Sequence, residues 1–256
     1  MEGAMIRIKR IQIPQLPTEN DRRLYVYLPR DYSRSDKRYP VLYMFDGHNV
    51  FYDSHATYGK SWGMKEDLEK SRLPIILVAI ECNPEGNRRL NEYSPWDIDV
   101  WDLGHLEGLG KITMDWMTKD LKPMIDSKYR TLPGREDTLV AGSSMGGLMA
   151  LYAVTQYNDV YSRAAALSPC FWAGGEALME LLAKPVKDPT RVYMDYGSGE
   201  IEEGERIDLC DMFDCASLLS GAGADVAARV VPGAEHNEAA WEKRIPLFMD
   251  YLLGKE

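Results

Sequence analysis

The residues best able to do chemistry in this chain form a Gly-x-Ser-x-Gly motif. Gly142, Ser144 and Gly146 follow an apolar run, Thr138–Ala141, and precede a second apolar run with helical spacing. This order is typical of a nucleophile elbow, in which a serine occupies a tight turn between a strand and a helix. Flanking glycines leave room for the turn, and free N–H groups at the helix start can bind a developing oxyanion. Ser144 is therefore the candidate nucleophile.

The motif alone has an ordinary alternative, a glycine-rich turn between a strand and a helix. The regular segments on both sides favour the elbow. A dinucleotide-binding fingerprint would require glycine where Ser144 stands, and the Gly-Lys-Ser/Thr of a Walker loop does not follow here. Both phosphate-binding interpretations therefore fail on spacing.

A serine hydroxyl attacks readily when a histidine removes its proton and an acid orients that histidine. In the hydrolase arrangement the chain order is serine, acid, histidine. His236 is the only histidine after Ser144, and it lies in a turn-rich segment before the last expected helix. A lone loop histidine is usually a surface residue, but this position and its uniqueness favour a catalytic base.

The acid is expected just past the strand Arg191–Tyr196. Glu200 is best placed, because two glycines before it free the loop to turn the carboxylate toward the histidine. Asp195 lies inside the strand, and Glu202 and Glu203 lie farther along the chain. Any of these acids could instead be a solvated loop charge.

Two backbone N–H groups are expected to form the oxyanion hole. One belongs to Met145, directly after the nucleophile, and the other to the loop that follows the strand Val41–Phe45. Gly47 permits a sharp turn in that loop, which makes the His48 N–H the candidate second donor. The alternative is that Asp46 and Gly47 are simply a loop after a strand.

Strands and helices alternate along the chain, which predicts a mostly parallel sheet covered by helices on both faces. Ligands of such sheets bind at the carboxyl ends of the strands. The expected strands are Ile6–Ile13, Arg23–Leu28, Val41–Phe45, Ile75–Glu81, Thr138–Ala141, Ala164–Leu167, Arg191–Tyr196 and Asp225–Val231. Besides the helix after the motif, the expected helices are Met64–Ser71, Ile112–Ser127 with a kink at Pro123, Gly175–Ala183, Glu205–Leu219 and Glu238–Leu253.

One segment, Asn83–Lys111, shows no clear period and is expected to be irregular. It carries Tyr93, Trp96 and Trp101, which either build a binding cleft or anchor the segment to the core.

The composition limits the class of protein. A chain of 256 residues with 45% apolar and 27% charged residues is expected to fold as one domain, 1–256. The net charge of −10 argues against nucleic acid or an anionic membrane as partner. The four cysteines and four histidines lack zinc spacing, so no metal is expected. Mostly buried thiols and a cytoplasmic location are expected.

Six further stretches strengthen the case made by the motif. With these stretches and the motif taken together, the chain resembles the putative-esterase family of α/β-hydrolases. This family includes acetylxylan and feruloyl esterases, enterochelin-type trilactone esterases and more distant mycolyltransferases. The resemblance runs from about Tyr25 to the C-terminus. The segments that carry it are Tyr39–Phe51, Asn87–Arg89, Glu92–Trp96, Asp120–Asp126, Ala141–Leu148, Tyr193–Glu200 and Gly233–His236.

The resemblance implies an α/β-hydrolase fold and a triad of Ser144, Glu200 and His236. The chain departs from the family at His48, where members commonly have glutamine. The family's acid varies between Asp and Glu, so the assignment of Glu200 rests on its position in the loop.

The resemblance also places Asp46 and Trp62 near the bound alcohol or sugar, with Trp172 as a further wall residue. These tryptophans could equally be core residues.

The expected function is that of a serine carboxylesterase that needs no cofactor. Its expected substrates are acetyl or hydroxycinnamoyl esters of a sugar or polyol, either small molecules or oligosaccharides. Alternatives within the family are a siderophore trilactone esterase, an acyltransferase and a thioester hydrolase. The alternative from another class is a non-catalytic binding protein that retains the fold.

Overall fold

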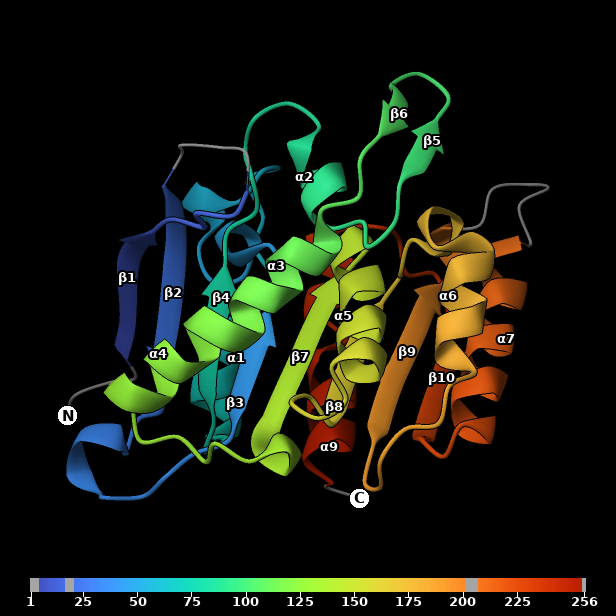
Figure 1. The fold of residues 1–256 in the computed structure, drawn as a ribbon. Coiled ribbons are helices and arrows are strands. Elements are labelled where there is room, and N and C mark those ends of the chain that lie inside the picture. Colours follow the sequence, from blue (N-terminus) through green and yellow to red (C-terminus); the bar gives the residue numbers. More distant parts are fainter. Residues whose placement is uncertain (1–4, 17–20, 201–206, 255–256) are drawn as a thin grey trace.

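An eight-stranded mixed sheet forms the centre of the molecule (Figure 1). The computed structural model describes residues 5–16, 21–200 and 207–254. The strand order is β1-β2-β4-β3-β7-β8-β9-β10, in which β1 and β2 are antiparallel to their neighbours and the others are parallel. The strands are β1 (Met5–Ile11), β2 (Arg22–Leu28), β3 (Val41–Met44), β4 (Ile76–Ile80), β7 (Thr138–Ser143), β8 (Arg163–Leu167), β9 (Arg191–Gly197) and β10 (Asp225–Val231).

Helices cover both faces of this sheet, as the sequence predicts. On one face lie α3, α4, α5, α6 and α7, and on the other lie α1, α8 and α9 (Figure 1). Alternate strand residues enter the two apolar layers: Tyr43 packs into the first, and Leu42 and Met44 pack into the second. The helices are α1 (Met64–Ser71), α2 (Arg88–Glu92), α3 (Gly110–Trp116), α4 (Lys122–Lys128), α5 (Met145–Gln156), α6 (Gly175–Leu182), α7 (Ile207–Gly221), α8 (Glu238–Glu242) and α9 (Ile245–Leu253).

Two predicted helices are interrupted near prolines. The single helix expected over Glu238–Leu253 is wrong: α8 and α9 are separate. Pro246 lies in the first turn of α9, where its missing N–H costs nothing. Between α3 and α4 the chain forms a π-helical turn, Met117–Leu121, just before Pro123. A wider turn accommodates a residue that cannot donate to the preceding turn. The start of the helix expected from Glu205 lies outside the described residues.

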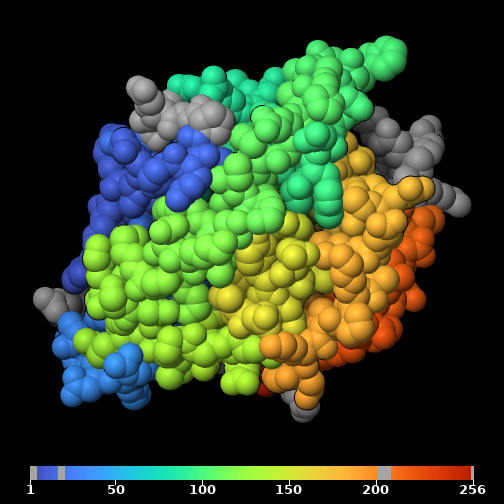
Figure 2. All heavy atoms as spheres, in the orientation of Figure 1, coloured from blue at the N-terminus to red at the C-terminus, as the bar shows by residue number. Residues whose placement is uncertain are grey.

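The segment expected to be irregular contains α2 and a small hairpin, β5 (Ile98–Val100) and β6 (Gly104–Leu106). The hairpin stands clear of the body of the molecule (Figure 2). Tyr93 is buried against Phe45, and Trp96 packs edge-on against Tyr152, so these two aromatics anchor the segment. Trp101, in the turn of the hairpin, is fully exposed.

No helix in the described part of the chain is long and apolar enough to cross a membrane.

The turn between β7 and α5 is strained and closely packed. Ser144 has φ 57° and ψ −125°, an uncommon conformation for a residue with a side chain. Its N–H donates to the Leu167 carbonyl, and its own carbonyl accepts from Leu148 and Cys170. A Cβ on Gly142 would lie 2.5 Å from the carbonyl oxygen of Gly146. The first glycine of the motif therefore lets the strand end approach the helix start.

Gly142→Ala should lower the free energy of unfolding by about 1–3 kcal/mol, because backbone rather than a flexible side chain opposes the new methyl group. Gly134→Ala is the matched control. A Cβ there meets nothing within 4 Å, and the backbone has φ −66°. In urea unfolding, the free energy of unfolding of the control should stay within about 0.5 kcal/mol of the wild-type value. Equal losses in the two variants would contradict the packing argument.

Candidate active site

Ser144 and His236 line one cavity of about 320 Å³ at the carboxyl ends of the central strands. Ser144 follows β7, and His236 lies in the loop between β10 and α8. Asp46, from the loop after β3, and Trp241, from α8, also line this cavity. Segments far apart in the sequence therefore meet where parallel sheets bind their ligands.

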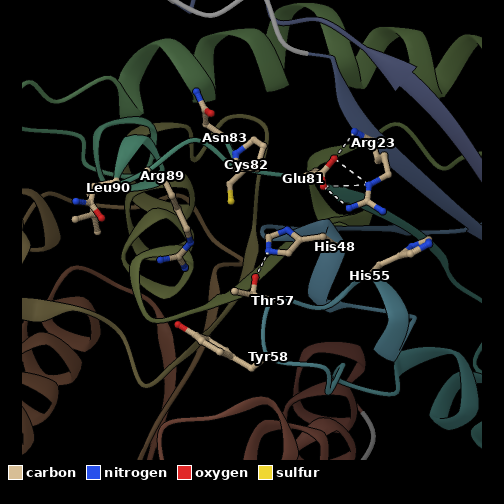
Figure 3. A pocket seen from close by; sticks show the side chains of 13 residues that line it. Arg23, His48, His55, Thr57, Tyr58, Glu81, Cys82, Asn83, Arg89 and Leu90 are labelled. Atoms are coloured by element: carbon tan, nitrogen blue, oxygen red, sulfur yellow. Dashed lines mark hydrogen bonds and ion pairs between the residues drawn. The ribbon is translucent and has the colours of Figure 1, made fainter.

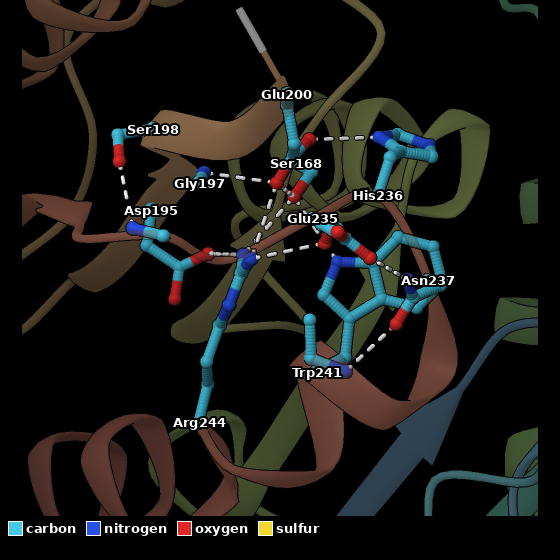
Figure 4. A network of polar contacts seen from close by, with 12 residues as sticks. Ser168, Asp195, Gly197, Ser198, Glu200, Glu235, His236, Asn237, Trp241 and Arg244 are labelled. Atoms are coloured by element: carbon cyan, nitrogen blue, oxygen red, sulfur yellow. Dashed lines mark hydrogen bonds and ion pairs between the residues drawn. The ribbon is translucent and has the colours of Figure 1, made fainter.

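His236 is hydrogen-bonded to Glu200 (Figure 4). Its Nδ1 lies 2.8 Å from Glu200 Oε2, on a side chain that is only 2% exposed. The other oxygen, Oε1, accepts from the Gly197 N–H at 2.8 Å and the Ser168 hydroxyl at 2.7 Å. With Nδ1 donating to the carboxylate, a neutral ring has Nε2 free to accept a proton.

The donors around Glu200 favour its ionised form. Burial raises the pKa of this carboxyl, but hydrogen bonds from His236, Ser168 and Gly197 outweigh it, and the pKa is lowered. A charged carboxylate next to the ring stabilises an imidazolium when one forms.

Asp195, the alternative acid, is fully buried and has other partners. Its carboxylate accepts from the Tyr193 hydroxyl and from Arg244, each at 2.9 Å. Burial raises its pKa despite these contacts. The structure thus brings Glu200, and not Asp195, to His236. Glu202 and Glu203 lie outside the described residues.

Arg244 joins the two carboxylates. This buried guanidinium contacts Asp195 at 2.9 Å, Glu200 at 3.1 Å and the Ser168 hydroxyl at 3.1 Å. One cation between two buried carboxylates offsets the cost of removing both from water. Sequence reasoning missed Arg244, because no motif or spacing rule singles out one arginine among thirty basic residues.

The Ser144 hydroxyl contacts a thiol in this structure. Its Oγ lies 3.2 Å from Cys170 Sγ, and among the described residues that thiol, not His236, is its hydrogen-bond partner. Cys170 is only partly buried and Cys210 is exposed, so the expectation of mostly buried thiols holds for Cys82 and Cys215 alone.

The predicted oxyanion donors occupy suitable backbone positions. Met145 opens α5, where an N–H has no acceptor within its own helix. His48 lies in the 3-10 turn after β3, next to Gly47, whose Cβ would fall 2.7 Å from the Ala79 backbone. Their role as donors stays a prediction.

Asp46 lines the cavity, but an arginine holds its carboxylate. Arg89 Nε donates to Asp46 Oδ1 and a terminal nitrogen of Arg89 donates to Oδ2, each at 2.7 Å. Burial raises the pKa of Asp46, but Arg89 outweighs it and the pKa is lowered. The Asp46 N–H donates to the Tyr93 hydroxyl at 3.0 Å. Asp46 thus fixes the loop after β3, and any contact with substrate would be shared with Arg89.

Asp46, His48 and Cys82 lie close enough to hold a metal ion. Their chemistry fits one poorly, because Arg89 already occupies the carboxylate and burial keeps the Cys82 pKa well above its ordinary value.

Trp62 is not among the residues that line the cavity of Ser144. It is 3% exposed and stacks on Trp241, with ring centroids 5.6 Å apart, and its expected contact with the alcohol stays a prediction. Trp241, which sequence reasoning missed, lines this cavity directly. Its Nε1 donates to Ser168 Oγ at 3.0 Å, and its ring lies edge-on to His236. Trp172 is about half exposed and lies just after Cys170, beside the nucleophile turn.

A second cavity of about 470 Å³ adjoins the first (Figure 3). The two share His48, Thr57, Tyr58 and Arg89 as lining residues. A ligand bound near Ser144 could therefore extend past Arg89 into the second cavity.

A family model described as "Putative esterase" matches residues 17–248. The chain belongs to this esterase family. It is therefore an ester-hydrolysing enzyme, as the sequence predicted.

Two curated relatives of this esterase are similar to it at moderate identity. The "Uncharacterized protein YbbA" of Bacillus subtilis is 26% identical over 193 residues, which cover 73% of this chain and 72% of that protein. The "Endo-1,4-beta-xylanase/feruloyl esterase" of Xylanibacter ruminicola is 25% identical over 85% of this chain but only 27% of its own length.

Solved structures share the fold of the esterase. An IroE-like serine hydrolase from Shewanella oneidensis superposes with a TM-score of 0.75 at 20% identity, covering 96% of this chain and 80% of its own. An S-formylglutathione hydrolase from Agrobacterium tumefaciens gives 0.69 at 15% identity, covering 99% and 96%. The predicted α/β-hydrolase fold is confirmed.

Arg244→Met should lower the free energy of unfolding by about 3–5 kcal/mol, because it leaves two buried carboxylates without their shared cation. Arg229→Met, at an exposed arginine of β10, is the control and should change it by less than about 0.5 kcal/mol. Urea unfolding at neutral pH measures both. A loss below about 1 kcal/mol in Arg244→Met would show that the cation is dispensable.

Acid should remove the stability that Glu200 contributes. Its folded pKa lies below the ordinary value of 4.5, so the contribution is present above that pH and is lost as pH falls through the lowered folded pKa. Urea unfolding of wild type and Glu200→Gln between pH 7 and the acid limit of the fold measures this. The stability advantage of wild type should be constant near neutrality and shrink below pH 4.5. An advantage that grows on acidification would reverse the sign of the argument.

Proposed function

We propose that this esterase is a serine carboxylesterase that hydrolyses acyl esters of a sugar or polyol through an acyl-enzyme intermediate. The observation that carries the proposal is the hydrogen bond between the buried Glu200 and His236, which lines one cavity together with Ser144 on its strained turn. Such a set supplies a nucleophile, a base and the acid that orients the base. We further propose that the whole chain, 1–256, acts as one domain in the cytoplasm.

In the first step His236 Nε2 takes the Ser144 proton while Oγ bonds to the ester carbonyl carbon. For this transfer the Ser144 hydroxyl, which contacts the Cys170 thiol in this structure, turns toward His236. The N–H groups of Met145 and His48 hold the negative oxygen. The carbon–alkoxy bond then breaks, and His236 returns the proton to the departing alcohol.

In the second step His236 removes a proton from water, whose oxygen attacks the acyl carbon. The bond to Ser144 breaks, the serine regains its proton from His236, and the acid is released.

Two features support an alcohol rich in hydroxyl groups. The cavity is lined by polar side chains of both kinds, donors such as Asn49 and acceptors such as Glu238. A relative's name also includes feruloyl esterase activity.

A siderophore ester is the second candidate. Siderophore hydrolases of Aspergillus nidulans have TM-scores of 0.71 and 0.70 to this fold, and the adjoining cavity offers space for a larger ligand. Hydrolysis rates on acetylated xylan, methyl ferulate and a trilactone siderophore separate these candidates from each other. Thioester hydrolysis is a third candidate, because the S-formylglutathione hydrolase with a TM-score of 0.69 acts on a thioester by its name. Acyl transfer is a family alternative that no specific feature favours.

A fluorophosphonate probe should label Ser144, and Ser144→Ala should lower p-nitrophenyl acetate hydrolysis by about 10³-fold or more. Ser143→Ala, at the neighbouring cavity serine, is the control and should keep the label and most activity. Glu200→Gln should lower turnover by about 10²–10⁴-fold. A non-catalytic binding protein would give no label. A larger loss in Asp195→Asn than in Glu200→Gln would assign the acid to Asp195.

A further inference from the structure

Glu238 places a carboxylate in the cavity, and no cation of the described residues pairs with it. It is the first residue of α8, is 5% exposed, and lines the cavity together with Ser144 and His236. Asn49 Nδ2 donates to its Oε1 at 2.9 Å. Among the residues that the structure describes, Glu238 forms no ion pair, whereas Asp46 has Arg89.

The amide that holds Glu238 is itself fixed. Asn49 Oδ1 accepts from the Thr57 N–H at 3.0 Å, so the amide must turn its NH₂ group toward Glu238. A buried carboxylate is unfavourable unless donors surround it, and burial raises the pKa of Glu238. Because Asn49 holds Oε1 and the side chain lines the cavity, Glu238 is a positioned acceptor with spare capacity beside the nucleophile.

A hydroxyl of the substrate fits this acceptor better than an ammonium group. Arg89 lines the same cavity and opposes a second cation, although its pairing with Asp46 offsets part of that repulsion. A hydroxyl can instead donate to Glu238, and a neighbouring hydroxyl can accept from a polar N–H group of the cavity.

We propose that Glu238 selects the alcohol part of the ester by accepting a hydrogen bond from a hydroxyl group close to the ester oxygen. This inference rests on the proposed esterase function and names a specificity-determining residue for it. A hydroxyl bound to a carboxylate forms a charge-assisted hydrogen bond, which an alkyl group in the same place cannot form. Binding of the alkyl analogue would leave the buried carboxylate unpaired.

Two acetate esters of nearly equal shape test the proposal: 2-hydroxyethyl acetate and propyl acetate, in which a methyl group replaces the hydroxyl. Wild type should prefer the hydroxyl ester by about 10–100-fold in kcat/KM. Glu238→Gln should reduce that preference about tenfold, because the amide offers a weaker neutral acceptor. Glu238→Asp keeps the charge but withdraws it by one methylene, so it should also reduce the preference for the hydroxyl ester. This variant replaces Glu238→Gln in the test if Glu238→Gln is poorly folded.

Glu242→Gln is the matched control. It makes the same substitution on the same helix, at a half-exposed residue that pairs with Lys60, and should keep the wild-type preference. A purely structural role for Glu238 would lower both rates together and leave their ratio unchanged, which would overturn the proposal. Equal rates of wild type on the two esters would also overturn it.

Acetylcholine separates the two chemistries that a carboxylate can recognise. A wild-type preference for acetylcholine over both neutral esters, lost in Glu238→Gln, would overturn the hydroxyl proposal in favour of cation recognition. Hydrolysis of none of the three esters, with Ser144 unlabelled by the fluorophosphonate, would instead overturn the proposed function on which the inference rests. Labelled Ser144 with no hydroxyl preference would overturn the inference alone.

Discussion

One buried carboxylate, that of Glu200, ties the candidate site to the fold. Its oxygens accept hydrogen bonds from Gly197 at the end of β9, from Ser168 after β8, from Arg244 between α8 and α9, and from His236. A buried charge is tolerated only when such donors surround it. The orientation of the histidine is therefore set by the same contacts that join the carboxyl ends of the strands to the final helices.

The nucleophile depends on a second constraint, which is backbone packing. Gly142 allows the end of β7 to contact the start of α5, and Gly47 allows the loop after β3 to contact β4. Both turns contain a residue with a side chain at positive φ, Ser144 in one and Asp46 in the other. Strain of this kind, about 1–3 kcal/mol per residue, persists only where surrounding contacts enforce it. The rigid sheet thus presents both loops to one cavity.

Local patterns in the sequence were sufficient to predict the strands of the central sheet, the elbow and the loop that brings Glu200 to His236. They could not identify Arg244, because its partners come from two other elements and no spacing records that contact. The place of Trp62 was left open for a similar reason: tryptophan suits a cleft or a core, and its stacking on Trp241 joins side chains far apart in the chain. By contrast, the break before α9 could be predicted from Pro246, because proline is disfavoured inside a helix.

The central claim is that Ser144 forms a covalent bond to the acyl group. The most direct measurement is rapid acid quenching of the enzyme during p-nitrophenyl acetate turnover, followed by mass spectrometry of its peptides. The account predicts one acetyl group on the peptide that contains Ser144, formed before steady state and absent in Ser144→Ala. Acetyl on Cys170, whose thiol lies 3.2 Å from the serine hydroxyl, or turnover with no acylated peptide, would contradict it.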